Sequence, residues 1–190
     1  GRSSAIFNEA EGIKLRFNSK VDGIPYDGKY IFSAMGYNFL PSEISAAFAL
    51  EQLKKLKNNI KLRIKNFNFL RSFFKDYSYY LKLPLQNEKI KTGWLAFPLV
   101  LKNRKGIERR KLQIYLEKKG IQTRTIFTGN ILRQPIMKGL KYKKHKLASA
   151  ISNDVMKNGI LIGCHHGLKL KELKFMCKTF KNYFKKFKKI

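Results

Sequence analysis

Hydrophobic residues recur every three or four positions between Ser42 and Phe74. Ser42 can cap a helix through its hydroxyl, and Glu43 would place a carboxylate in the positive first turn. The apolar positions that follow are Ile44, Ala47, Phe48, Leu53, Leu56, Ile60, Ile64, Phe67, Leu70 and Phe74. This spacing predicts a helix with one buried face, and we expect a break or bend near Asn58-Asn59.

Shorter patterns follow the long helix. The predicted elements are, in order, a buried strand over 93–101, a helix over 108–120, a strand over 121–127, an irregular segment, a strand over 159–164 and an amphipathic helix over 168–190. Pro98 would favour an edge or a bulge in its strand, and Gly120 is a helix stop. Residues 1–30 predict irregular chain with a short strand or two and a turn at 26–28. The order is that of an α/β module whose small sheet is covered by helices.

Composition agrees with a folded chain. The 190 residues are 44% hydrophobic and 13% aromatic, enough for one sizeable domain or a small domain with extra helices. The two cysteines, Cys164 and Cys177, have no paired spacing, so the pattern predicts neither a disulfide framework nor a zinc site, and Cys177 is expected in the core. With no apolar run of about 20 residues and no signal peptide pattern, a soluble, cytoplasmic protein is expected.

The charge is strongly basic. Lys and Arg number 41 against 12 Asp and Glu, a net charge of +29. Such a surface attracts nucleic acid and anionic lipid, but the lysines are spread through nearly every segment and are not gathered on one stripe or tail. A basic module that binds nucleic acid or a membrane surface therefore stays an alternative, while neither partner is expected.

Candidate chemistry is confined to polar residues in turns. The chain contains no phosphate-binding glycine loop, nucleophile elbow or zinc-protease motif. The polar candidates are Tyr37, Asn38, Arg124, Asn130, Arg133, Gln134, His165 and His166. Arginine suits bidentate recognition of phosphate or carboxylate, and asparagine offers a donor and an acceptor, so these groups predict an anionic, polyhydroxylated ligand. Surface salt bridging is the alternative for either arginine, and no metal is expected at Cys164-His165-His166 for want of a fourth ligand.

Three segments carry a family resemblance. "GYNFLPSEISAAFALEQLKKL" resembles the GYN-x-x-x-S/T-D/E signature of the DegT/DnrJ/EryC1/StrS sugar aminotransferases, which depend on pyridoxal or pyridoxamine phosphate. "TRTIFTGNILRQPIMKG" and "NGILIGCHHGL" resemble the branch of NDP-4-keto-6-deoxyhexose 3-dehydratases, although that branch often has Tyr-Pro or His-Pro where this chain has His165-His166. The resemblance implies the C-terminal part of the aspartate-aminotransferase-like (fold type I) fold. Residues 1–57 would end the large cofactor-binding domain and contact the dimer partner, and 58–190 would form the small α/β domain.

The resemblance also implies a function and site residues. Such a homodimeric enzyme uses pyridoxamine phosphate to remove the C3 hydroxyl of a nucleotide-linked 4-keto-6-deoxyhexose, for a cell-surface polysaccharide such as lipopolysaccharide. Asn38, supported by Tyr37, would contact the cofactor phosphate across the dimer interface. The substrate side would be lined by Arg124, Asn130, Arg133, His165 and His166.

Two expectations limit the assignment. The catalytic base, a histidine in dehydratases and a lysine in aminotransferases, lies upstream of the matching region, so no residue here is assigned as catalytic and a nucleotide-sugar aminotransferase stays the alternative. Most cofactor contacts would lie upstream too, and residues 1–190 alone are expected to be inactive. Iron–sulfur members carry cysteines where this chain has 3–6 as Ser-Ser-Ala-Ile, so no iron–sulfur cluster is expected.

Overall fold

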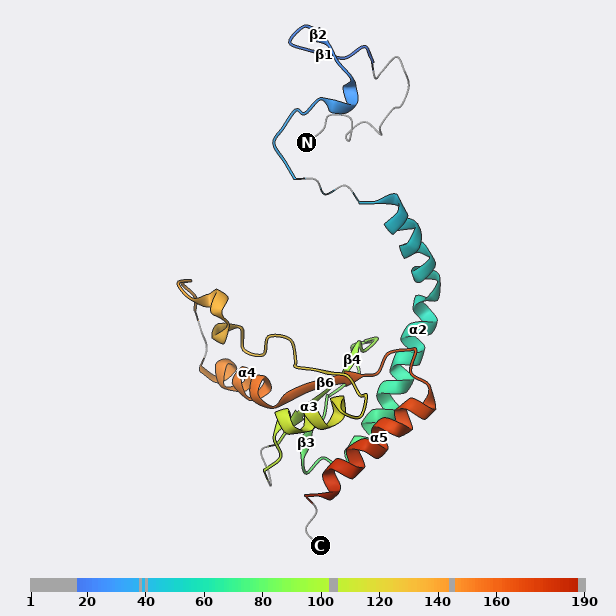
Figure 1. Ribbon diagram of the computed structural model, residues 1–190, viewed down its shortest axis with the longest axis vertical. Helices are drawn as coiled ribbons and strands as arrows, with labels where there is room; N and C mark the ends of the chain where they lie inside the picture. Colours follow the sequence, from blue (N-terminus) through green and yellow to red (C-terminus); the bar gives the residue numbers. More distant parts are fainter. Residues whose placement is uncertain (1–16, 38, 40, 103–105, 144–145, 188–190) are drawn as a thin grey trace. The chain divides into compact units, whose positions relative to one another are not determined.

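The computed structural model describes residues 17–187 apart from 38, 40, 103–105 and 144–145. The chain divides into two compact units, residues 1–51 and 52–190. Figure 1 shows the elements along the chain. The division predicted from the family resemblance, after residue 57, stays a prediction.

The first unit contains a small hairpin. Strands β1 (Lys20–Val21) and β2 (Ile24–Pro25) pair antiparallel. Asp22 and Gly23 between them both have positive φ, 49° and 81°, which is the backbone of a tight two-residue hairpin turn favoured by Asp-Gly. A 3₁₀ helix, η2 (Gly28–Tyr30), follows and is closed by the hydrogen bond from Tyr30 N to Asp27 O at 2.9 Å. The predicted short strands are therefore confirmed within the described residues, whereas the turn predicted at 26–28 is wrong, because the hairpin turn lies at Asp22 and Gly23 and Gly28 begins η2.

The long helix α2 (Glu43–Lys75) is continuous. A break at Asn58-Asn59 is wrong, because asparagine keeps its backbone N–H and costs a helix interior at most about 0.7 kcal/mol relative to alanine, while a bend there stays a prediction. The C-terminal part of α2 carries the buried face expected from its periodicity, with Phe67, Leu70 and Phe74 at most 1% exposed.

The main sheet lies in the second unit. Its order is β3-β4-β6-β5, formed by β3 (Leu81–Lys82), β4 (Ala96–Leu101), β6 (Gly159–Gly163) and β5 (Thr123–Arg124). All three pairings are antiparallel. β4 is an interior strand, yet Pro98 is tolerated there because β3 pairs only with Val100 and Leu101, which leaves the β3 side of Pro98 without a partner strand.

Three helices pack on this sheet around one core. The helices α3 (Arg109–Glu117) and α5 (Leu170–Lys185) were predicted and are confirmed. Their buried residues join those of α2 and of the strands in one cluster. Aromatic rings dominate its centre, as where Phe74 contacts Phe97 at 5.5 Å and Phe180 edge-on at 4.9 Å between ring centroids. Cys177 is buried in the same cluster, as expected.

The helix α4 (Lys146–Asn158) corrects the predicted irregular segment. It contacts β4 and β6, and β6 begins directly after it. Before α4, the chain forms two short 3₁₀ helices, η3 (Ile131–Arg133) and η4 (Pro135–Met137). The strand predicted over 121–127 shortens to β5, because β6 offers pairing positions to Thr123 and Arg124 only.

Candidate functional site

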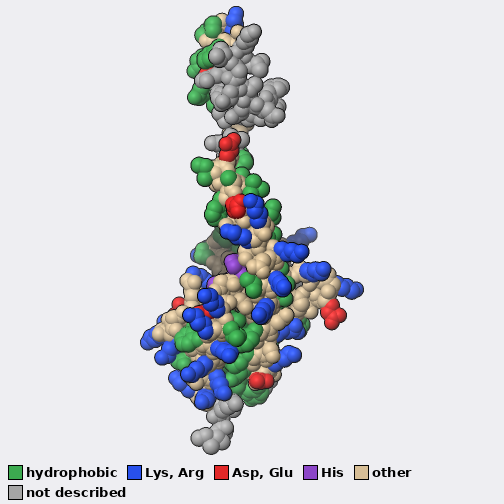
Figure 2. All heavy atoms as spheres, turned by 90° about the vertical axis from the view of Figure 1, so that its right-hand side faces the viewer, with side chains coloured by type: hydrophobic (Ala, Val, Ile, Leu, Met, Phe, Trp, Pro, Cys, Tyr) green, Lys and Arg blue, Asp and Glu red, His purple; other side chains and the backbone are tan. Residues whose placement is uncertain are grey.

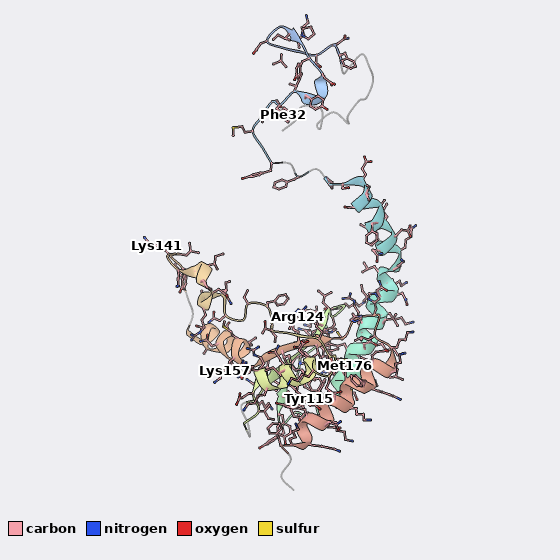
Figure 3. All side chains as sticks on the ribbon, viewed as in Figure 1. Phe32, Tyr115, Arg124, Lys141, Lys157 and Met176 are labelled. Carbon is pink, nitrogen blue, oxygen red and sulfur yellow. The ribbon has the colours of Figure 1, made fainter. Side chains whose placement is uncertain are left out.

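A pocket of about 410 Å³ opens beside β5 and β6. It is lined by Ala96, Gly120, Ile121, Gln122, Thr123, Arg124, Leu161, Ile162, Gly163, His165, Leu168, Glu172, Phe175 and Met176. Figure 3 labels two of its residues, Arg124 from β5 and Met176 from α5. The wall is mostly apolar, and its five polar side chains are Gln122, Thr123, Arg124, His165 and Glu172. An apolar pocket with a few convergent polar groups is the usual form of a small-molecule site. We call it the Arg124 pocket.

Arg124 is held by its neighbours on β5. Its Nη1 donates to the Thr123 carbonyl at 3.0 Å. With the Gln122 amide oriented so that its oxygen faces the guanidinium, that oxygen accepts from Nη2 at 2.8 Å. No carboxylate forms a salt bridge with Arg124 among the residues that the structure describes. The guanidinium is thus hydrogen-bonded to neutral oxygens. Together with the hydrogen bonds from Thr123, its charge lowers the pKa of the nearby Glu117 carboxyl, but without a salt bridge to a described carboxylate it is able to attract an anion.

Thr123 ties β5 to the end of α3. Its backbone N–H and its hydroxyl both donate to Glu117 Oε1, at 2.6 and 2.8 Å. The hydroxyl hydrogen bond, followed by the backbone one, lowers the pKa of the Glu117 carboxyl below its usual value. This arrangement satisfies the buried Thr123 and fixes the strand from which Arg124 projects.

His165 is positioned by a buried asparagine of α2. Asn66 Nδ2 donates to the carbonyl of His165 at 2.8 Å and to that of Leu168 at 3.2 Å. The Gly167 N–H donates to His165 Nδ1 at 3.2 Å, so a neutral His165 carries its proton on Nε2 and can donate from there. His166 is exposed, its ring is turned by 83° from that of His165, and it is not part of the pocket wall.

Asn130 and Arg133 belong to a second group of polar residues. Asn130 is 3% exposed and accepts a hydrogen bond from Leu132 N at 3.1 Å, which caps η3. Its Nδ2 donates to Asn153 Oδ1 at 2.9 Å, and Arg133 Nε donates to the same oxygen at 2.5 Å. We call Asn130, Arg133 and Asn153 the Asn153 cluster. The structure therefore brings Arg124 together with His165 and, separately, Asn130 with Arg133; the substrate role of all these residues stays a prediction.

The predicted cofactor contacts lie in the first unit. Tyr37 is 85% exposed, and its ring stacks on Phe39 at 5.2 Å between centroids. Asn38 lies outside the described residues, as do Ser3 to Ile6. A single phenol hydroxyl is too little to hold a pyridoxal phosphate, because a phosphate needs several donors or cations. Of the two predicted cofactor contacts, the structure thus describes one phenol, and the role of both stays a prediction.

Other surface and core features narrow the chemistry. Lys and Arg side chains are scattered over the face seen in Figure 2, with hydrophobic side chains between them. No helix within the described ranges is both long and apolar enough to cross a membrane. Both thiols are buried, and burial raises the pKa of Cys164 and of Cys177 to about 11, which disfavours the reactive thiolate.

Sequence reasoning missed three polar residues of these two groups. Gln122 shares the alternation of β5 with Arg124, and that spacing could have identified it. Glu172 lies three residues after Lys169, whose N–H donates to it at 2.8 Å, a helix-capping position that the sequence shows. Asn153 gave no usable signal, because it meets Arg133 only through the tertiary placement of α4.

Comparison with known proteins adds family information. The model of the DegT/DnrJ/EryC1/StrS aminotransferase family matches residues 7–181. The chain is 31% identical over 173 residues to the lipopolysaccharide biosynthesis protein RfbH of Salmonella typhimurium, covering 89% of this chain and 39% of that protein. It is 35% identical over 153 residues to the GDP-4-keto-6-deoxy-D-mannose 3-dehydratase of Escherichia coli O55:H7, covering 77% and 38%.

A solved structure extends the similarity to the fold. The E. coli GDP-4-keto-6-deoxy-D-mannose-3-dehydratase with bound hydrated PLP is 32% identical, with a TM-score of 0.69 over 79% of this chain and 38% of that one. The fold class predicted from the sequence, part of the fold type I PLP-dependent transferases, is confirmed by this similarity. The chain spans about two fifths of the length of these relatives.

Proposed function

The chain belongs to the DegT/DnrJ/EryC1/StrS aminotransferase family, and on that premise we propose that it is the C-terminal part of a pyridoxamine-phosphate-dependent nucleotide-sugar 3-dehydratase. The reaction would remove the C3 hydroxyl of an NDP-4-keto-6-deoxyhexose in the synthesis of a cell-surface polysaccharide. The observation that carries the proposal is the identity above 30% to RfbH and to a named 3-dehydratase over most of this chain. The cytoplasmic location expected from the sequence stays a prediction.

In this proposal the chain's own residues hold the substrate. The Arg124 guanidinium and His165 Nε2 would donate to phosphate or hydroxyl oxygens, while Gln122 keeps the guanidinium in place. The apolar wall, which includes Phe175 and Met176, would exclude water around the bound sugar nucleotide. Positioning of this kind lowers a barrier without any proton transfer by these residues.

The cofactor would be held mainly by chain beyond these residues. When bound, pyridoxamine phosphate would supply the amino group that condenses with the C4 ketone. It would also supply the two electrons needed to replace the C3–OH bond by a C3–H bond, and would be left in its pyridoxal form. Tyr37 and Asn38 remain the proposed contacts from this chain. No residue of the chain is assigned as the catalytic base.

A homodimer is part of the proposal. The first half of α2 exposes apolar side chains at helical spacing, with Ile44 84%, Phe48 68% and Leu53 62% exposed. Exposed apolar surface of this kind marks contact regions, so we propose that a second copy covers it in the whole protein. A monomer in light scattering at micromolar concentration would contradict this part of the proposal.

The two candidate reactions of the family leave different products. Protein containing this chain and its upstream region is incubated with GDP-4-keto-6-deoxy-D-mannose, pyridoxal phosphate and glutamate, and the product is identified by NMR and mass spectrometry. A dehydratase gives the 3-deoxy-4-keto sugar, one oxygen lighter. An aminotransferase gives the 4-amino sugar with its C3 hydroxyl retained, and that product would replace the proposal by the alternative.

A further inference from the structure

One side-chain oxygen joins the two residues of the segment between β5 and α4 that the sequence singled out. Asn153 Oδ1 on α4 accepts from Asn130 Nδ2 at 2.9 Å and from Arg133 Nε at 2.5 Å. Asn130 in turn caps η3, the 3₁₀ helix that ends with Arg133. The orientation of Arg133 thus depends on a residue of another element that no motif includes.

The segment has further attachments. Gln134 Nε2 donates to the Thr128 carbonyl at 3.0 Å, and Gly129 lies against Met156 of α4 so closely that a Cβ on the glycine would come within 2.5 Å of the methionine side chain. The first contact lies within the segment, and the second packs the segment against α4 without Asn153. Asn153 adds a second attachment through Asn130, and it also sets the direction of the Arg133 side chain, which the packing of Gly129 does not.

The neutrality of Asn153 matters for the charge of Arg133. A carboxylate in its place could accept the same two hydrogen bonds but would form an ion pair and neutralise the guanidinium. The neighbouring carboxylate, Asp154, is engaged by Lys82 Nζ at 2.8 Å and by Asn158 Nδ2 at 2.7 Å. Among the described residues no salt bridge involves Arg133, and its hydrogen bond is made through Nε. Its terminal nitrogens remain for a partner outside the described chain.

We propose that Asn153 is a positioning residue of the nucleotide-sugar site, which aims Arg133 at a phosphate oxygen of the substrate while leaving the guanidinium charge uncompensated. The proposal rests on the proposed function and adds to it the ligand group that Arg133 takes, a diphosphate. A guanidinium fixed through Nε presents its outer pair of nitrogens in the planar geometry that suits two phosphate oxygens.

The test compares Asn153→Asp with Ile151→Asp in protein that contains this chain and its upstream region. Ile151 is 58% exposed and lies two residues before Asn153 on α4, so its substitution introduces the same charge on another face of the helix. Calorimetry measures the Kd of whichever of GDP, CDP, UDP and dTDP binds the unsubstituted protein most tightly. Kinetics with GDP-4-keto-6-deoxy-D-mannose give KM and kcat.

Asn153→Asp is expected to raise Kd and KM about tenfold, which corresponds to about 1.4 kcal/mol, with kcat within about twofold. Ile151→Asp is expected to change neither constant by more than about twofold. In an Arg133→Ala background Asn153→Asp should have no further effect on Kd, because the two residues act as one unit. A purely structural role would not produce this dependence on Arg133.

Each outcome decides the proposal. Equal Kd values for Asn153→Asp and the unsubstituted protein overturn the inference, and so does an effect on Kd that persists in the Arg133→Ala background. If the protein still dehydrates the sugar in that case, the proposed function stands. Nucleotide binding that depends on Asn153 through Arg133, without turnover, supports the inference and counts against the 3-dehydratase assignment. No binding of any of the four nucleotides overturns both. If Asn153→Asp fails to fold, Asn153→Ala decides, with an expected rise in Kd of about threefold that vanishes in the Arg133→Ala background.

Discussion

Replacing Gly129 by alanine should loosen the segment that carries Asn130 and Arg133. Gly129 has φ +67°, and an added Cβ would lie 2.5 Å from the Met156 side chain and 2.8 Å from the Met156 Cα. Because part of this contact is with backbone, a side-chain rotation of Met156 cannot relieve it. The substitution therefore forces the segment away from α4.

The magnitude has two parts. A left-handed conformation costs an alanine roughly 1–2 kcal/mol relative to glycine. The overlap with Met156 adds about 1–3 kcal/mol, as in other overpacked sites. Gly139 provides the matched control, because its φ is +81° and nothing lies within 4 Å of its added Cβ. Gly139→Ala should thus show the conformational cost alone.

Hydrogen exchange measures the result locally. The amides of Arg133 and Gln134 donate to Asn130 O and Ile131 O at 3.0 and 2.9 Å, and their exchange rates report the opening of this segment. In Gly129→Ala these two amides should exchange faster than in Gly139→Ala, by about tenfold for each 1.4 kcal/mol of destabilisation that the overlap with Met156 adds. Equal rates in the two variants would refute the close packing of the segment on α4.

Three further predictions test other parts of the structure. At pH 8 and in the folded protein, Cys164 and Cys177 should resist iodoacetamide, because burial raises their pKa to about 11; mass spectrometry that finds either thiol modified before unfolding would contradict their burial. Lys82→Met should lower the free energy of unfolding by a few tenths to about 1 kcal/mol at neutral pH. The hydrogen bond from Lys82 is the main cause of the lowered pKa of Asp154, and the pair lies on a surface where solvent screens the charges. This stabilisation is present above the ordinary carboxyl pKa and is lost as the pH falls through the lowered pKa of Asp154, so the unfolding free energies of the two proteins should converge in acid. A gap that does not narrow as the pH falls below the ordinary carboxyl pKa would exclude Asp154 as its source. Phe67→Leu should shift the emission of Trp94, whose ring stacks on Phe67 at 4.0 Å, and unchanged fluorescence would contradict that stack.

Periodicity predicted the elements whose burial is one-sided. In α5 the inward residues Leu173, Met176 and Phe180 follow helical spacing among exposed lysines, and the helix lies where the pattern placed it. In α4 the apolar residues are fewer, Ile151 is 58% exposed, and polar residues interrupt the pattern, so the helix could not be distinguished from irregular chain. Strands β3 and β5 have two residues each and depend on pairing with β4 and β6, which a local pattern does not contain.

Like the fold, the candidate site was predictable from the sequence only where local patterns determine it. Arginine, asparagine and histidine in glycine-containing turns pointed to ligand binding before any fold was known. The separation of Arg124 from the Asn153 cluster required the structure, because the two groups depend on different elements, β5 with α3 and η3 with α4. Asn66 likewise positions His165 across about half of the chain, a contact that no spacing rule predicts.

The central claim is that the Arg124 pocket binds the substrate of a nucleotide-sugar enzyme. The KM of the Arg124→Gln variant tests this claim most directly. The control is Arg110→Gln, which removes the same charge from an exposed position of α3 outside the pocket wall. For protein containing the chain and its upstream region, with GDP-4-keto-6-deoxy-D-mannose, loss of a charge-assisted hydrogen bond of about 1.5–3 kcal/mol predicts a KM about tenfold to 150-fold higher for Arg124→Gln. Arg110→Gln should leave KM nearly unchanged. The same KM in both variants would contradict the account.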